Sequence, residues 1–416
     1  MKATCLIQNI GELASPTGNR ALKGKEMRNI SIIRDAAILV EQDTIVWLGP
    51  ASELPALEGP KPEFIDAGGK AVIPGFVDSH THFVFGGYRD EEFFWRAGGL
   101  PYMEIHSRGG GIASSVKATR DASLEQLVAT AAPRLEHMLK LGVTTVEGKS
   151  GYGLDLDTEI RQLKAMRILE ASQAVDIIPT FMGAHSVPME YKGRAGAYIN
   201  FIIEKVMPVV IENSLAKFCD VFCEKGVFEI EDSRRLLKAA KTMGLEIKLH
   251  ADEIVPLGGA ELAAELSVVS ADHLLKASEH GLSEMAKAGV VATCLPLTAF
   301  SLKEPYAEAR KMIDAGLAVA IASDLNPGSC YSQSIPLAAA LSVLYMNLSM
   351  EETLTALTLN GAAALGLAHD RGSLEPGKLA DMLILDAPSY LHLAYNIGMN
   401  KVGRVIKKGK LVCTNN

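Results

Sequence analysis

From residue 71 onward, short apolar runs alternate with longer amphipathic stretches. The apolar runs are Ala71–Val77, Gly142–Val146, Asp176–Met182, Phe218–Cys223, Glu246–Leu249, Ser267–Ala271, Gly289–Leu295 and Ala318–Ala322. The segments between them can hold helices, as at Leu124–Leu141, Asp157–Ala174, Ala197–Asn213 and Asp232–Met243. Such alternation predicts an α/β protein built on a (β/α)8, or TIM, barrel. A doubly wound sheet is the alternative, but no Gly-x-Gly-x-x-Gly turn follows the first apolar run.

The two ends of the chain have a different texture from this middle. Residues 1–70 contain short β-type runs at Ala36–Glu41 and Thr44–Leu48, and similar runs return at Met382–Asp386 and Val405–Val412. Neither end has enough strands for a stable sheet of its own. We therefore expect residues 1–70 and 370–416 to form one small composite β-sandwich beside a barrel of residues 71–369.

Composition narrows the class of protein. The chain has 416 residues, 48% of them hydrophobic, and a net charge of −8, so no basic stripe invites nucleic acid and no charge supports membrane binding. No apolar run reaches about 18 residues, and the first residues lack the apolar core of a secretory leader. The six scattered cysteines suit a reduced, cytoplasmic protein; we expect Cys219 and Cys223 to be buried strand thiols.

Histidines gather where the predicted strands end. Five of the ten histidines follow such strands, namely His80, His82, His185, His250 and His273, whereas His106, His137, His280, His369 and His392 do not. The carboxyl ends of barrel strands form the active-site face. Side chains two residues apart on a strand point the same way, so His80 and His82 should lie side by side. Chance would scatter the histidines, so we expect one shared site.

The residue types at these ends indicate metal-assisted hydrolysis. His80, His82 and His250 with the carboxylate of Asp324 suit Zn²⁺ or another first-row divalent ion, with a position left for water. Such an ion lowers the pKa of water from about 15.7 towards about 7. Asp324 could also take the proton of that water or orient it. Glu253, three residues after His250, could carry a proton to a leaving nitrogen, and His273 could polarise a carbonyl.

This arrangement resembles the amidohydrolase superfamily along the whole chain. Within it the chain is most similar to the imidazolonepropionase family of histidine degradation. The segments that carry this resemblance are His80–Arg89, Gly109–Ile112, Lys149–Leu154, Gly183–Pro188, Lys248–Glu253, Ser270–His273, Ser323–Ser329 and, towards the C-terminus, Gly372–Asp381. Gly109–Gly111 lies in a long loop after the first strand, where we expect a flexible active-site loop.

The resemblance implies hydrolysis of 4-imidazolone-5-propanoate to N-formimidoyl-L-glutamate, with one Zn²⁺ or Fe³⁺ per chain and a homodimeric assembly. Arg89 would grip the propionate carboxylate with two hydrogen bonds. The expected substrate-binding residues are Arg89, Tyr152, His185, Glu253, Asn326, Gly328 and Ser329, and the catalytic ones are Glu253, His273 and Asp324. Glu224 and Lys225 are near enough in sequence to support a second metal, although we favour one.

Two other functions compete with this interpretation. One is deamination of a heterocyclic base by the same mononuclear metal site; Arg89, Tyr152 and His185 argue against it, because nucleobases lack an anionic tail. The other is a non-catalytic scaffold on the same fold. A scaffold would be expected to have lost metal ligands, whereas this chain has all four.

Overall fold

A parallel barrel forms the larger part of the molecule. The computed structural model describes residues 1–100, 104, 108 and 110–415. The barrel strands are β6 (Phe76–Asp78), β7 (Val143–Lys149), β8 (Asp176–Ala184), β9 (Phe218–Cys223), β10 (Glu246–Ala251), β11 (Ser270–His273), β12 (Val291–Cys294) and β13 (Ala318–Ile321), paired in that order. The ring closes where the Asp324 amide donates to the His80 carbonyl at 3.0 Å and the His82 amide donates to Leu325 at 2.8 Å. The predicted (β/α)8 barrel is confirmed.

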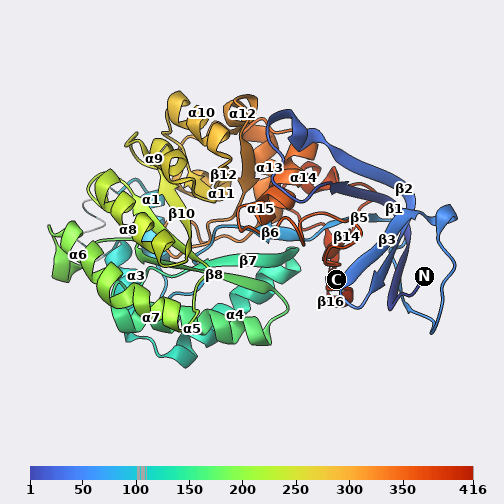
Figure 1. The fold of residues 1–416 in the computed structure, drawn as a ribbon, viewed down its shortest axis with the longest axis horizontal. Helices are drawn as coiled ribbons and strands as arrows, with labels where there is room; N and C mark the ends of the chain where they lie inside the picture. Colours follow the sequence, from blue (N-terminus) through green and yellow to red (C-terminus); the bar gives the residue numbers. More distant parts are fainter. Residues whose placement is uncertain (101–103, 105–107, 109, 416) are drawn as a thin grey trace.

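Helices cover the outside of this barrel (Figure 1). They include α1 (Asp90–Ala97), α3 (Ile112–Asp121), α4 (Leu124–Lys140), α5 (Leu156–Ser172), α6 (Ala195–Phe201), α7 (Met207–Glu212), α8 (Ile230–Thr242), α9 (Gly259–Leu266), α10 (Glu279–Ala288), α11 (Pro296–Leu302), α12 (Ala309–Asp314), α13 (Ile335–Tyr345), α14 (Met350–Leu357), α15 (Leu359–Ala363) and α16 (His392–Tyr395). Helix α4 starts at a capping box, because Ser123 accepts from the Gln126 amide while the Gln126 side chain accepts from the Ser123 amide. Between α6 and α7 the turn Ile202–Val206 widens to a π-helix, just before Pro208, which has no amide hydrogen to donate.

Strands from both ends of the chain form one mixed sheet. They are β1 (Cys5–Pro16), β2 (Ile30–Glu41), β3 (Thr44–Pro50), β4 (Glu63–Asp66), β5 (Ala71–Pro74), β14 (Met382–Leu385), β15 (Val402–Lys407) and β16 (Lys410–Thr414). Strand β5 joins β14 on one side and β1 on the other, so the C-terminal strands extend the N-terminal sheet. Both termini lie at this end of the molecule (Figure 1). The two ends therefore build one β unit as expected, while the exact boundaries at residues 70 and 369 stay a prediction.

The apolar run Ala71–Val77, predicted as one strand, is two. Residues 71–74 are β5 of the terminal sheet, and residues 76–78 are β6 of the barrel. Gly75 separates them, and a Cβ there would lie 2.4 Å from the Thr144 hydroxyl, so the crossing requires glycine. Strands β1 and β2 have twelve residues each and are longer than the short runs expected. Strand β1 contains polar positions and a register shift near Asn9, whose φ is +56°, and these hide its full length in the sequence.

An ionic contact joins the terminal sheet to the barrel. Asp176, at the start of β8, accepts from Arg371 at 2.8 Å, from Lys407 at 2.9 Å and from Lys408 at 3.0 Å. Burial alone would raise the pKa of Asp176, but Lys407 and Arg371 outweigh it and lower that pKa to about 2. The carboxylate is therefore charged over the whole range in which the protein would be handled.

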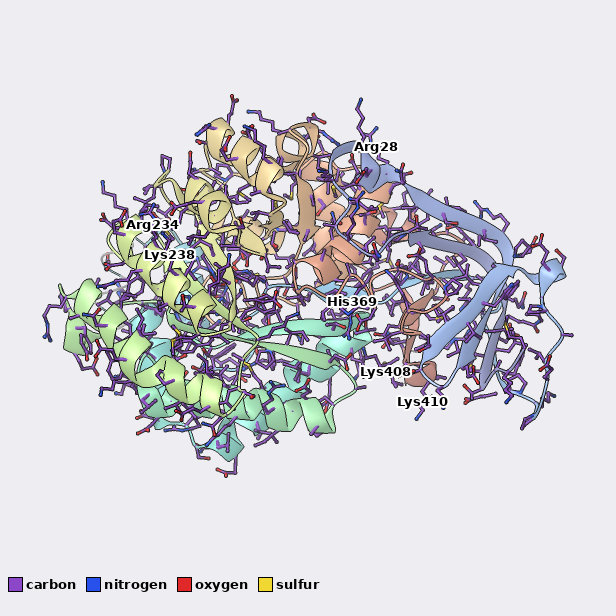
Figure 2. The ribbon with its side chains drawn as sticks, viewed as in Figure 1. Arg28, Arg234, Lys238, His369, Lys408 and Lys410 are labelled. Carbon is purple, nitrogen blue, oxygen red and sulfur yellow. The ribbon has the colours of Figure 1, made fainter. Side chains whose placement is uncertain are left out.

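Surface charges are spread over separate elements. Figure 2 shows Arg234 and Lys238 on α8, Arg28 at the end of the short 3-10 helix Gly24–Arg28 beside α12 and α14, and Lys408 and Lys410 on the terminal sheet. Arg234 is itself paired with Glu265 at 2.8 Å and Arg28 with Glu352 at 3.0 Å.

Among the described residues, no helix combines the length and the apolarity needed to cross a membrane. Cys219 and Cys223 are free, buried thiols on β9, as predicted.

Candidate active site

Four side chains predicted as metal ligands meet at the carboxyl end of the barrel. His80 and His82 follow β6, and their ring centroids lie 5.5 Å apart. The His250 ring, on β10, lies 4.5 Å from His80 and 5.6 Å from His82. Asp324 follows β13, with Oδ1 3.5 Å from His80 Nε2. All four are buried. Their role as ligands stays a prediction, but strands far apart in sequence do bring them together.

The ring nitrogens of these imidazoles fit a bound metal ion. His80 Nε2, His82 Nδ1 and His250 Nε2 are buried without a hydrogen-bond partner among the described residues, a costly arrangement unless something else binds them. One ligand atom each of His80, His82 and Asp324 lies within 4.8 Å of the others, as does one each of His80, His250 and His273. Burial lowers the pKa of His80, His82 and His250, which favours the neutral imidazole that a metal binds. The donor set suits zinc or iron.

Asp324 is held in place by its neighbours. Its backbone is in the left-handed region, with φ of +53°, so the chain makes a sharp change of direction directly after β13. Thr298 donates its hydroxyl to Asp324 Oδ2 at 2.7 Å, and Asn326 donates to Oδ1 at 3.2 Å. Burial raises the pKa of Asp324 to about 7. Sequence reasoning gave no role to Thr298, which lies inside α11 rather than at a strand end.

Carboxylates behind the histidines face their other ring nitrogens. Asp272 Oδ2 is hydrogen-bonded to His80 Nδ1 at 2.6 Å, and Asp220 Oδ2 lies 3.0 Å from His250 Nδ1 without hydrogen-bond geometry. A carboxylate behind a ligating imidazole fixes its orientation and raises its basicity. Asp272 was noted in the sequence only as part of a strand end, and Asp220 was missed because it stands inside the apolar run of β9. A carboxylate within an otherwise apolar strand was the signal.

Glu253 and His273 lie together beside the ligands. Their Oε2 and Nε2 atoms are 3.5 Å apart. The turn that presents Glu253 is organised by Asp252, whose carboxylate accepts four backbone amides, from residues 257 to 260. Burial raises the pKa of Glu253 to about 8, helped by Asp324 and Glu224, whereas burial lowers the pKa of His273 to about 4. At neutral pH this pair is a protonated carboxyl beside a neutral imidazole.

Tyr152 and His185 form an aromatic wall against His82. The His185 ring stacks on His82 at 4.8 Å, and Tyr152 meets His185 edge-on at 5.2 Å. The Tyr152 loop is fixed by the buried carboxylate of Glu159, which accepts the amides of residues 151, 153 and 154. His185 Nδ1 lies 3.1 Å from the Gly151 carbonyl, and burial lowers the pKa of His185 to about 4. The structure thus places both predicted substrate contacts beside the ligands.

Arg89 lies at the start of α1 and is paired with Glu92. Its Nε donates to Glu92 Oε2 at 3.0 Å and its Nη2 to Oε1, while Glu92 also accepts the Gly111 amide at 2.7 Å. Burial raises the pKa of Tyr152 and the charge of Arg89 opposes that rise, which puts the two in one neighbourhood. A Cβ on Gly328 would lie 2.0 Å from Arg89 Nη1, so a larger residue there would force the guanidinium to shift. A cavity of about 710 Å³ between α1 and α11 borders Arg89.

The loop after Asp324 is closed by its own hydrogen bonds. Asn326 Oδ1 accepts the amides of Gly328 at 2.9 Å and Ser329 at 2.8 Å, and its Nδ2 donates to the Ser329 hydroxyl at 2.8 Å. The groups predicted to bind substrate are therefore engaged with one another here, and Asn326 also steadies Asp324. Their contact with substrate stays a prediction.

Other predicted features lie apart from this cluster. The carboxylate of Glu224 accepts hydrogen bonds from the backbone amides of Lys225 at 3.0 Å and Ile254 at 2.9 Å. Gly109 and His106 lie outside the described residues; Gly111 caps α3 with φ of +89°. His369 lies between the barrel and the terminal sheet (Figure 2).

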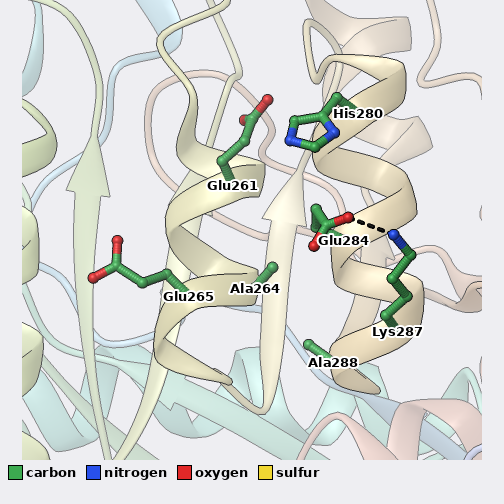
Figure 3. A pocket seen from close by; sticks show the side chains of 7 residues that line it. All are labelled: Glu261, Ala264, Glu265, His280, Glu284, Lys287 and Ala288. Carbon is green, nitrogen blue, oxygen red and sulfur yellow. Dashed lines mark hydrogen bonds and ion pairs between the residues drawn. The ribbon is translucent and has the colours of Figure 1, made fainter.

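A separate surface pocket of about 470 Å³ lies between α9 and α10. In it His280 neighbours Glu261, and Glu284 pairs with Lys287 at 2.6 Å (Figure 3).

The sequence matches known proteins along its length. Residues 71–412 match the model of the amidohydrolase family. The chain is 54% identical over 412 residues to an imidazolonepropionase from Clostridium tetani, which covers 99% of this chain and 98% of that protein. It is 57% identical over 404 residues to an imidazolonepropionase from Bacteroides fragilis, covering 96% and 97% of the two chains.

Solved structures share the fold at much lower sequence identity. A triazine hydrolase variant superposes with a TM-score of 0.75 at 17% identity, covering 99% of this chain and 95% of that one. A 5-methylcytosine deaminase from Klebsiella pneumoniae has a TM-score of 0.74 at 18% identity, covering 99% and 98%. At such identities the likeness supports the barrel with its flanking sheet and says nothing about the reaction.

Proposed function

The chain belongs to the amidohydrolase family and, within it, to the imidazolonepropionases, and from this premise we propose that it hydrolyses 4-imidazolone-5-propanoate to N-formimidoyl-L-glutamate in histidine degradation. The observation that carries the proposal is the 54% identity over nearly the whole of both chains. The geometry agrees with it, because three imidazoles and one carboxylate converge beside an arginine suited to an anionic tail. A cytoplasmic homodimer acting on this small molecule is part of the same proposal.

His80, His82, His250 and Asp324 would hold one ion per chain, Zn²⁺ or Fe³⁺. When bound, such an ion acts as a Lewis acid and lowers the pKa of water from about 15.7 towards about 7. The chain itself supplies four converging donors, three of them buried nitrogens with no other partner. Thr298 and Asn326 hold the carboxylate of Asp324 in register with them.

Two neighbouring carboxyl groups, Asp324 and Glu253, can carry the proton transfers. Water oxygen bonds to the ring carbonyl carbon, the carbon–nitrogen bond breaks, and the leaving nitrogen gains a proton. The carboxylate of Asp324, held by Thr298 and Asn326, can take a proton from the attacking water. Glu253, with a pKa near 8, carries a proton at neutral pH and can give it to the leaving nitrogen. The two carboxyls thus divide the roles of base and acid.

His273 would stabilise the charge that develops on the carbonyl oxygen. Its imidazole is neutral at physiological pH, since burial lowers its pKa to about 4, and a neutral imidazole has one N–H to donate. Its Nε2 lies 3.5 Å from Glu253 Oε2, so the proposed oxyanion donor and the proposed acid lie side by side. A preoriented donor in a buried site stabilises a transition-state oxyanion strongly.

Recognition of the propionate would fall to Arg89. Glu92 engages Nε and Nη2, so Nη1 is the donor best placed for the substrate carboxylate. Tyr152 and His185 would add a hydroxyl and an imidazole on the adjacent wall. Asn326, Gly328 and Ser329 would bind the polar groups of substrate or product once the hydrogen bonds among these three residues are broken. A nucleobase substrate has no anionic tail, so Arg89 would not strengthen its binding.

The test is a turnover assay on freshly prepared imidazolone propionate. Loss of the ring absorbance should be matched by a product heavier by one water, with no ammonium released in the same turnover. A deaminase would release one ammonium per turnover and keep the ring, and a scaffold would do neither. Arg234→Ala, on the outer surface of α8, serves as a matched control that should leave the rate unchanged. Ammonium in step with turnover would refute the proposal.

A further inference from the structure

A fully buried ionic cluster lies inside the barrel, behind His80 and His250, and the proposed reaction steps do not use it. Two ammonium groups, Lys149 and Lys248, face three carboxylates, those of Glu147, Asp220 and Asp272. None of these five side chains has any exposed surface. Buried charges are rarely kept unless they are paired and have a function.

Each ammonium bridges two or more of the carboxylates. Lys149 Nζ lies 2.7 Å from Asp220, 3.0 Å from Glu147 and 3.5 Å from Asp272. Lys248 Nζ lies 2.6 Å from Glu147 and 3.7 Å from Asp272, and it also donates to the Ser79 carbonyl at 2.9 Å. Thr180 and Ser270 complete the cluster by donating to Glu147 and Asp272 at 2.5 and 2.7 Å.

The same carboxylates are arranged as cation ligands. One ligand atom each of Asp220, His250 and Asp272 lies within 4.8 Å of the others, and the same holds for His80, Glu147 and Asp272. Either trio is compact enough for a metal ion, and each includes a histidine of the proposed centre. The lysine nitrogens lie against these very oxygens, so each trio already has its positive charge.

Lys149 keeps its positive charge inside this cluster. Burial alone would lower its pKa, but Asp220, Glu147 and Asp272 together raise it above the ordinary value. Glu224 and Lys225, the residues that the sequence offered for a second metal, are not in the cluster, and the carboxylate of Glu224 is occupied by backbone amides. The cluster therefore has a cation without recruiting one from solution.

We propose that Lys149 and Lys248 are built-in cations that take the place of a second metal ion, restrict the centre to one metal, and hold Asp272 and Asp220 where they orient His80 and His250. This inference rests on the metal site of the proposed function. Its consequence is a latent second cation site, which removal of the Lys149 ammonium group would open between Asp220 and Asp272.

The decisive variant is Lys149→Ala, with metal content measured by elemental analysis after saturation with Zn²⁺ and gel filtration. The wild type should hold one ion per chain and Lys149→Ala two. Methylammonium, a replacement for the missing charge, should compete with the second ion and return the count towards one. Lys225→Ala is the matched control, since it removes an ammonium near β9 that is not in the cluster, and it should stay at one.

A second variant covers the case in which Lys149→Ala does not fold. Lys149→Met fills the space without the charge, so it should still hold at most one ion, with an affinity about 10- to 100-fold weaker, the usual effect of disturbing groups behind the ligands. A folded Lys149→Ala that stays at one ion, or Lys149→Met with wild-type affinity, would overturn the inference. A wild type with no tightly bound metal would instead count against the proposed function, so the two failures are distinguishable.

Discussion

Replacing Arg89 with Met tests how the substrate's carboxylate is recognised. The change keeps an unbranched chain of similar length against Gly328 and removes the guanidinium. A charge-assisted hydrogen bond contributes about 1.5 to 3 kcal/mol, which corresponds to about 10- to 150-fold in kcat/KM. Because the carboxylate lies away from the bond that breaks, most of the loss should be in KM, with a smaller loss in kcat if the ring is misplaced.

The structure adds a second consequence that must be separated from the first. Without Arg89, the Gly111 amide is the one remaining hydrogen-bond donor to the Glu92 carboxylate among the described residues, although Glu92 is just 7% exposed; the charge of Arg96 still acts on it. An unpaired buried carboxylate costs about 1 to 3 kcal/mol of stability. The double variant Arg89→Met/Glu92→Gln removes that unpaired charge, so it should regain stability in denaturant titrations and recover none of the substrate affinity.

The assay compares the propionate substrate with an analogue whose carboxylate is an uncharged amide. The wild type should prefer the acid by about 10- to 150-fold in kcat/KM, and both Arg89 variants should lose most of that preference. Metal content should stay at the wild-type value in both. If Arg89→Met kept the full preference for the acid, the guanidinium would not be the partner of the tail, and the roles given to Tyr152 and His185 would need to be tested next.

Three further changes probe other parts of the molecule. His250→Ala should lose metal and activity together, because it removes one of four donors; a stoichiometric ion in the purified variant would contradict this role. Glu253→Gln should keep the metal and lower kcat about 10²- to 10⁴-fold, since glutamine carries no transferable proton; near-normal turnover would move the acid role to another group. Asp176→Asn should lower the free energy of unfolding at pH 7 by about 2 kcal/mol. The folded pKa of Asp176 is lowered to about 2, so its stabilisation is present above about pH 4 and is lost as the pH falls towards 2. A difference between wild type and Asp176→Asn that did not shrink in that range would contradict the ion pair.

The barrel was predictable because its signal is repeated. Each apolar run of suitable length is followed by a stretch with helical spacing, and one misjudged boundary does not disturb the count. The Ala71–Val77 run shows the limit of this reasoning. Hydrophobicity is continuous from β5 into β6, so nothing in the run itself marks the change of sheet. The close approach of Gly75 to Thr144 decides it, and that contact depends on the folded position of β7.

The site was predictable only where a strand ends. Residues at the carboxyl ends of parallel strands converge whatever the register, which is why His80, His82, His250 and Asp324 could be grouped without knowing which strands are neighbours. Thr298 and Glu92 could not be found in this way. Each acts from a helix, and its partner is set by how that helix packs on the mouth of the barrel.

The cluster behind the histidines lies between these two cases. The alternation that puts His80 beside His82 also puts Glu147 on the same face as Lys149, and Lys248 on the same face as His250. Alternation therefore predicts that charges point into the barrel, at the same face as the ligands. It does not say which charges meet, because that depends on register: the pairing of β10 with β11 sets His250 opposite Asp272 and Lys248 opposite Ser270, and the long Lys248 side chain then reaches to 3.7 Å from Asp272. A charge inside an apolar strand is thus a reason to look for its opposite on another strand of the barrel, and here that search leads from the predicted metal ligands to the two lysines.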